Sequence, residues 1–188
     1  MKKLACFAVL LAAAHLQPAR AADWKMDPSG SRLEFAATFE KTPAPGVFKE
    51  FDARLRFDPE KPAGGRLDVT IRVASADMAS ADINQAIAGP EWFDFARHPQ
   101  AEFHATDIRR SQAGPRSYVA RGTLALKGVQ QPVEVRFTWS AAGEGATMEG
   151  EFTVKRGPFG IGSGEWAATD VIGPDVKVKF RVRLRKAL

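Results

Sequence analysis

Apolar and polar side chains alternate along most of the chain after residue 32. In the first run, Leu33, Phe35, Ala37 and Phe39 fall on one face and the residues between them on the other. The same period of two recurs in seven later runs, at residues 51–57, 67–73, 101–105, 118–126, 133–139, 148–154 and 176–184. Successive side chains of a strand point to opposite faces, so each run predicts a β-strand with one apolar face. Eight such strands in one domain-length chain predict an all-β antiparallel fold, either a closed barrel or a sandwich.

Glycine and proline mark the turns between these predicted strands. They occur at residues 58–65, 114–115, 143–145 and 173–174, and Lys127-Gly128 predicts a tight hairpin between the fifth and sixth runs. One connection differs from the others. Residues 80–89 contain helix formers, Ile83 and Ile87 stand four apart, and Ser80 or Asp82 is placed to cap a short helix.

An aromatic segment follows the predicted helix, with Trp92, Phe93 and Phe95 close together. A long crossover that carries three aromatic rings would cover one end of a barrel. Aromatic side chains serve packing as readily as they serve ligand binding. The sequence therefore leaves two interpretations of these rings, a plug beneath the crossover or a surface that faces a ligand.

The apolar faces of the eight runs contain no charged residue. A ligand held among them must itself be apolar, because a buried charge on it would lack a partner. Several inward positions are small: Ala37, Ala53, Ala101, Ala105, Ala120, Gly122 and Gly150. Such residues either create a cavity or fit the taper of a packed barrel.

The first 21 residues have the pattern of an export leader. Lys2 and Lys3 precede an apolar stretch from residue 4 to 16, and Ala19-Arg20-Ala21 matches a small-x-small cleavage site. We therefore predict a signal peptide at 1–21 and one domain at 22–188, which places the protein in the periplasm. Removal of the leader leaves 24 basic and 22 acidic residues, a net charge of +2 that does not indicate nucleic-acid binding. The single cysteine, Cys6, lies in the leader, so the remaining domain has no thiol chemistry.

No motif in the domain indicates catalysis. His98 and His104 lack the spacing of a metal site, and no nucleophile or paired acids stand in a recognisable pattern. The glycines at 160, 162 and 164 do not match a phosphate-binding loop, so a turn or bulge is expected there. We predict no metal, no cofactor apart from an apolar ligand, and no enzyme activity.

Across nearly all of the predicted domain the chain resembles the YceI-like family of periplasmic polyisoprenoid-binding proteins. Matching segments occur in the order of the family, at residues 24–27, 47–52, 57–59, 75–78, 92–94, 98–103, 122–124, 127–133 and 156–161. The resemblance implies an eight-stranded, lipocalin-like barrel around an apolar tunnel. It also implies that the tunnel binds an isoprenoid, a quinone or a fatty-acid derivative without catalysis.

The chain departs from the family pattern at positions that would bear on a ligand head group. Gly30-Ser31 stands where the family often has His-Ser, and Ala81-Asp82 where it often has Arg-Asp. A proline-bearing loop at 41–45 replaces a further histidine. Residues 162–166 resemble a subgroup associated with membrane cytochromes of the b561 type, so such a cytochrome is a second partner hypothesis, and a homodimer a third.

The predicted ligand-binding residues are the large inward side chains and the aromatic rings of the crossover. They are Phe35, Phe39, Phe51, Phe57, Ile71, Trp92, Phe93, Phe95, Phe103, Leu124, Phe137, Phe152, Phe159 and Phe180. Two alternatives remain, an enzyme acting on a lipid-like substrate and a packed barrel that binds a membrane protein. The first would need a polar residue that points inward, and the second would have no continuous cavity.

Overall fold

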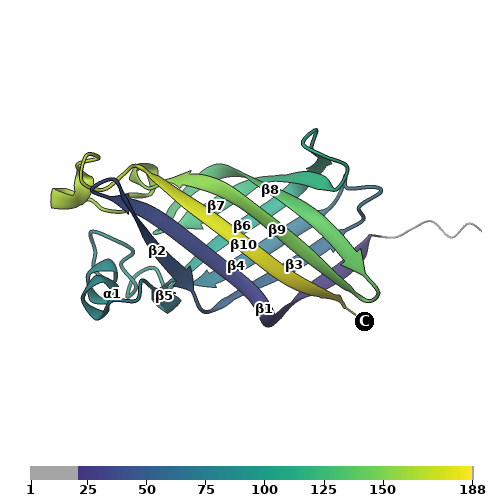
Figure 1. The fold of residues 1–188 in the computed structure, drawn as a ribbon, viewed down its shortest axis with the longest axis horizontal. Coiled ribbons are helices and arrows are strands. Elements are labelled where there is room, and N and C mark those ends of the chain that lie inside the picture. The colour runs from purple at the N-terminus through teal and green to yellow at the C-terminus, as the bar shows by residue number, and fades with distance from the viewer. Residues whose placement is uncertain (1–20, 188) are drawn as a thin grey trace, which may run out of the picture.

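All eight alternating runs become strands of one closed antiparallel barrel (Figure 1). The computed structural model describes residues 21–187. Its strands are β1 (Ala22–Phe39), β2 (Thr42–Phe48), β3 (Phe51–Phe57), β4 (Arg66–Arg72), β5 (Ala76–Asp77), β6 (Gln100–Arg110), β7 (Ser117–Leu126), β8 (Val129–Ala142), β9 (Gly145–Lys155) and β10 (Asp175–Lys186). Around the barrel they follow the order β1-β3-β4-β6-β7-β8-β9-β10, and β10 pairs with β1 to close it. The predicted all-β eight-stranded barrel is confirmed.

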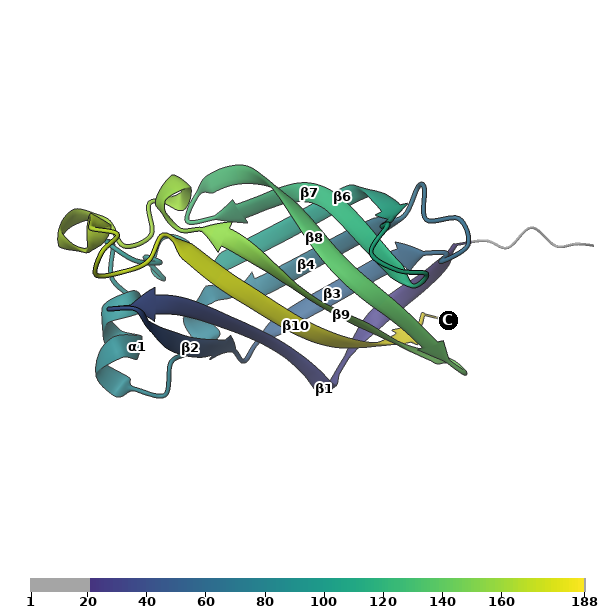
Figure 2. The same ribbon diagram turned by 45° about the horizontal axis from the view of Figure 1, so that its top comes forward.

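Strand β1 is shared between the barrel and a small extension. Its first residues, Ala22 to Lys25, pair with β3, and its later residues, Leu33 to Phe39, pair with β2. Between these parts the register with β10 shifts from Asp27 to Arg32, around Gly30, which has a φ of +82°. This irregularity lets one strand bend away from β3 and carry β2 and β5 at one end of the barrel (Figure 2).

The prediction of a loop at residues 41–45 is wrong. Residues 42–48 form β2, in which Pro43 lies opposite Thr38 and Pro45 opposite Ala36. The other side of β2 pairs with β5 only at Val47 and Phe48. The prolines thus occupy an edge strand, where a missing N–H breaks no ladder on the free side.

The predicted connections agree with the structure at most other places. Lys127 and Gly128 have φ values of 50° and 74°, as a two-residue hairpin turn requires. The helix α1 spans Ala81–Ile87, and the hydroxyl of Ser80 accepts a bond from the amide of Ile83 at 3.4 Å. Three short 3-10 helices complete the elements, η1 (Val73–Ser75), η2 (Gly157–Phe159) and η3 (Gly164–Ala167).

The predicted leader lies outside the described residues, apart from Ala21 at its end. Within residues 21–187, no helix is both long and apolar enough to span a membrane.

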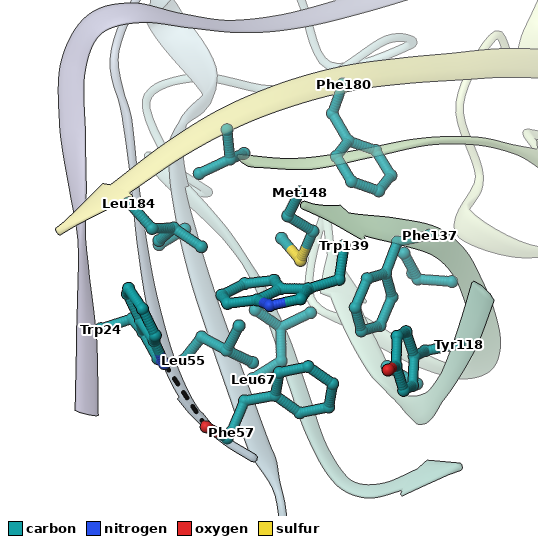
Figure 3. Packing of buried hydrophobic residues seen from close by; sticks show 14 of the residues in the cluster. Trp24, Leu55, Phe57, Leu67, Tyr118, Phe137, Trp139, Met148, Phe180 and Leu184 are labelled. Atoms are coloured by element: carbon teal, nitrogen blue, oxygen red, sulfur yellow. Dashed lines mark hydrogen bonds between the residues drawn. The ribbon is translucent and has the colours of Figure 1, made fainter. Parts of the chain in front are cut away.

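One end of the barrel is filled by a cluster of aromatic side chains, which we call the closed end (Figure 3). Phe57 is its centre, with ring centroids 4.9 Å from Tyr118, 5.9 Å from Phe137 and 5.1 Å from Trp139. Trp24 packs edge-on against Trp139 and donates its indole N–H to the carbonyl of Phe57 at 3.4 Å. All five rings are at least nine-tenths buried, so this half of the barrel interior is solid.

Candidate functional site: an apolar cavity

The other half of the barrel interior is hollow. The cavity has a volume of about 150 Å³. All eight barrel strands contribute inward residues to its wall. From β1 these are Leu33 and Phe35, and from β10 every second residue from Val176 to Val182. No polar atom is exposed on the wall. An apolar cavity of this kind stays dry and accepts apolar guests.

Nine of the predicted ligand-binding residues line this cavity. They are Phe35, Phe51, Ile71, Phe93, Phe103, Leu124, Phe152, Phe159 and Phe180. Seven of them come from the alternating runs, and Phe93 and Phe159 come from the connections at the mouth. Their contact with a ligand remains a prediction.

The other five predicted residues do not line the cavity. Phe57 and Phe137 belong to the closed end, where they pack against other rings. Phe39 lies at the end of β1 and is 44% exposed. Trp92 contacts Trp166 at 5.8 Å between centroids, and Phe95 stacks on Phe93.

The small inward residues serve two different purposes. Ala53 and Ala101 line the cavity, so their size contributes to its volume. Gly122 and Gly150 do not line it. A Cβ at these two positions would lie 2.3 Å from the carbonyl oxygen of His104 and 2.1 Å from that of Arg136. These glycines allow neighbouring strands to approach closely, which a tightly coiled barrel needs.

Sequence reasoning missed several wall residues, most of which had a usable signal. Leu33, Val69 and Val133 occupy inward positions of predicted strands, but the predicted ligand-binding residues are mostly aromatic and do not include these three. Phe48 lies on β2, the strand that was not predicted. Ile161 lies in a connection without periodicity, and nothing local in the sequence indicates its place.

The most consequential residue missed is Arg156, which lies at the mouth of the cavity and is only 4% exposed. Its guanidinium donates to six backbone carbonyls, those of Ile161, Gly162, Trp166, Ala168, Ile172 and Gly173, at 2.7 to 3.4 Å. Among the described residues no carboxylate pairs with it, and burial lowers its pKa. The inward parity of residues 148–154 continues to 156, and this was the signal available in the sequence.

All six carbonyls belong to the connection between β9 and β10. We call residues 157–173 of this connection the mouth loop. Its glycines at 160, 162 and 164 have φ values of 65°, 66° and 63°, which confirms a turn there. Lys127 Nζ donates to the carbonyl of Gly160 at 2.7 Å, and Ser163 donates its amide to the carbonyl of Glu91 at 3.0 Å. The mouth loop is therefore held at the end of the barrel by hydrogen bonds from the buried Arg156 and by those that Lys127 and Glu91 make with it.

The cavity wall offers no acid, base or nucleophile among the described residues. His104 lies on the outer face and pairs with Asp68, and the ring of His98 packs on the turn at Gly128. No group of three potential metal ligands occurs in residues 21–187. Within the described part of the chain, Arg156 is the one charged residue of the wall, and backbone carbonyls already accept hydrogen bonds from its donors. The arrangement can hold an apolar molecule by burial and by packing.

Comparison with known proteins yields one family. A model described as the YceI-like domain matches residues 24–184. The UPF0312 protein of Pseudomonas savastanoi pv. phaseolicola is 28% identical over 169 residues, which cover 85% of this chain and 87% of that protein. A UPF0312 protein of Photorhabdus laumondii is 34% identical over 88 residues, and there the match spans only 44% of that protein.

Solved structures share the barrel. BcnA of Burkholderia cenocepacia superposes with a TM-score of 0.80 at 34% identity, covering 84% of this chain and 98% of BcnA. A domain from Saccharophagus degradans, described as polyisoprenoid-binding, has a TM-score of 0.69 at 15% identity and covers 89% of this chain. At that identity the second likeness shows the fold alone.

Proposed function

Because this chain belongs to the YceI-like family, we propose that its barrel binds a long apolar chain and carries it without changing it. The expected ligands are isoprenoids, quinone tails and fatty-acid derivatives. The half-barrel cavity, whose wall exposes no polar atom to the interior, is the observation that carries this proposal. The description of the Saccharophagus domain as polyisoprenoid-binding supports the same class of ligand. The predicted leader supports a periplasmic location.

In such a site the binding free energy becomes more favourable as the apolar chain of the ligand becomes longer. Each buried methylene contributes about 0.8 kcal/mol, so a prenyl or acyl chain can bind well with no polar contact. The wall offers no group that could act on the chain, which supports a carrier and not an enzyme. A fully packed barrel would not contain such a cavity. The b561-type cytochrome and the homodimer remain predictions.

The proposal is tested by filling the cavity. We expect the purified protein to retain an apolar adduct in native mass spectrometry and to take up the fluorescent apolar probe N-phenyl-1-naphthylamine. Ala101→Phe adds a ring to the cavity wall and should reduce uptake at least about tenfold, by loss of space for the guest. Ala125→Phe, on the outer face of β7, is the matched control and should bind as the unaltered protein does.

A homogeneous unliganded mass together with no probe uptake would sink the proposal. Equal uptake by Ala101→Phe and Ala125→Phe would show that the probe binds elsewhere. Circular dichroism establishes that both variants remain folded.

A further inference from the structure

The exposed large apolar side chains of the described residues all lie at one end of the barrel. They are Phe39 at 44%, Ile83 at 43% and Val171 at 38% exposure. Phe39 ends β1, Ile83 lies on α1 and Val171 lies in the mouth loop. Figures 1 and 2 both show these three elements at the same end, opposite the C-terminus. Single exposed apolar residues need no explanation, but three on separate elements around one opening do.

Two of the three side chains stand on segments that are joined directly. Phe39 forms a β-bridge with Ile172, and the amide of Glu40 donates to the carbonyl of Val171 at 2.8 Å. The turn after β1 and the mouth loop thus form one continuous edge. We call this edge, together with α1, the mouth rim.

The mouth rim differs in charge from the barrel wall. Outer positions of the strands carry ion pairs, such as Arg121 with Glu134 and Arg181 with Glu149. The turn at residues 40–41, residues 81–87 and residues 160–173 together instead contain four acids, Glu40, Asp82, Glu165 and Asp170, and one base, Lys41. Such a surface gains nothing from anionic lipid head groups, which attract lysine and arginine.

We propose that the mouth rim docks on a neutral lipid bilayer surface, with Phe39, Ile83 and Val171 inserted among the head groups. This proposal rests on the proposed function, because an apolar ligand must pass between cavity and membrane. Phe159 and Ile161 of the mouth loop line that cavity, so the rim lies at its end of the barrel, whereas the closed end is solid. Docking by the rim removes the water between the two apolar phases, so the chain need not cross an aqueous gap.

The test uses the purified protein and phosphatidylcholine vesicles in a flotation assay. We expect association that persists at high salt and does not strengthen when phosphatidylglycerol is added. The triple variant Phe39→Ser, Ile83→Ser, Val171→Ser should lower the partition coefficient at least tenfold. Val119→Ser with Ala125→Ser, on the outer face of β7, is the control and should associate as the unaltered protein does.

Tryptophan fluorescence reports which end meets the lipid. Trp92 and Trp166 lie at the mouth, and Trp24 and Trp139 lie buried in the closed end. Vesicles of brominated phosphatidylcholine should quench the fluorescence of the protein, and the Trp92→Phe, Trp166→Phe variant should lose that quenching.

Three results would overturn the docking proposal. The first is no vesicle association in a protein that still takes up the apolar probe, which leaves the carrier function intact. The second is association that needs anionic lipid and fails in salt, which would assign the contact to lysine and arginine side chains outside the rim. The third is a rim-dependent dimer in place of vesicle binding, which would assign the rim to a second copy of the chain. Loss of probe uptake itself would count against the proposed function instead.

Discussion

At the scale of single residues, Arg156 explains how a loop of about seventeen residues is held over an open cavity. Backbone carbonyls of the mouth loop have no strand partner, and buried carbonyls need donors. The guanidinium supplies up to five N–H groups in a rigid plane, which suits several acceptors arranged around it. One side chain directly after β9 therefore reaches six carbonyls, three of them through the two N–H groups of Nη2, and brings residues 161–173 together around itself.

Replacing Arg156 should release this loop. We expect Arg156→Met to lower the free energy of unfolding by about 2–4 kcal/mol, because several buried carbonyls lose their donors. Hydrogen exchange should accelerate throughout residues 160–173. Arg156→Lys, which keeps the charge with fewer donors, should be intermediate. Urea unfolding and exchange mass spectrometry measure both effects.

Arg121→Met is the matched control, since Arg121 is exposed and pairs with Glu134 on the outer wall. It should change stability by less than about 1 kcal/mol. An Arg156→Met protein with unaltered stability and unaltered exchange would show that the carbonyls find other partners.

At the scale of elements, the carboxylate of Asp77 contributes to joining α1 to the small extension, beside the buried contact of Ile87 with Phe35 and Ala76. Asp77, at the end of β5, pairs with Lys49 and accepts bonds from the side chain of Asn84 and the amide of Ala79 at 2.9 Å each. These bonds, that from Lys49 first, hold the pKa of the Asp77 carboxyl well below its usual range. The seven-residue helix is too short to be stable alone, so it depends on such contacts.

The depressed pKa predicts how α1 responds to acid. The stabilisation by Asp77 is present above the unfolded-state pKa of about 3.9 and is lost as the pH falls below it. We expect the exchange protection of α1 to decline below about pH 4, after correction for intrinsic rates. In Asp77→Asn the protection should already be low at pH 7 and should vary little with pH.

Asp52→Asn serves as the control, because Asp52 pairs with Arg54 on the barrel wall. If this variant and Asp77→Asn had the same exchange profile in α1, Asp77 would not be the residue that joins the helix.

At the scale of the whole molecule, the barrel divides into a packed half and a hollow half. Phe57 and Phe51 stand on the same inward face of β3, yet Phe57 is 1% exposed and Phe51 is half-buried beside the cavity. The packed half provides contacts that order the interior, and the hollow half gives up such contacts to leave space for a guest. Stability and binding are thus assigned to opposite ends of the same strands.

This division predicts unequal costs for the same substitution. Phe57→Ala should lower the free energy of unfolding of the unliganded protein by about 3–5 kcal/mol, because it opens a void among packed rings. Phe51→Ala should cost less than half as much, since its ring already borders empty space. Urea unfolding measures both, and equal costs would contradict a solid closed end.

Much of the barrel could be predicted because alternation is a local property. Each inward residue is followed two positions later by another, so strands 51–57 and 176–184 and their buried faces can be recognised without knowledge of their partners. The turn at Lys127-Gly128 is equally local. Strand β2 could not be recognised in this way, because Thr42 to Gly46 has no alternation and its two prolines argue against a strand. Strand β2 forms because residues 33–39 of β1 pair with it along the whole length of β2.

The order of residues along the chain was enough to establish the alternating strands, their apolar inward face and the lack of inward charge in the eight runs. Which phenylalanines pack and which line a cavity became known from the folded barrel, because this depends on the side chains from other strands that each ring meets in the interior. The same holds for Arg156, whose inward direction follows from parity but whose six partners lie in a loop that carries no pattern of its own. Whether a side chain points inward is set by the residues next to it along the chain. Whether it borders empty space is set by the strands that surround the same barrel interior.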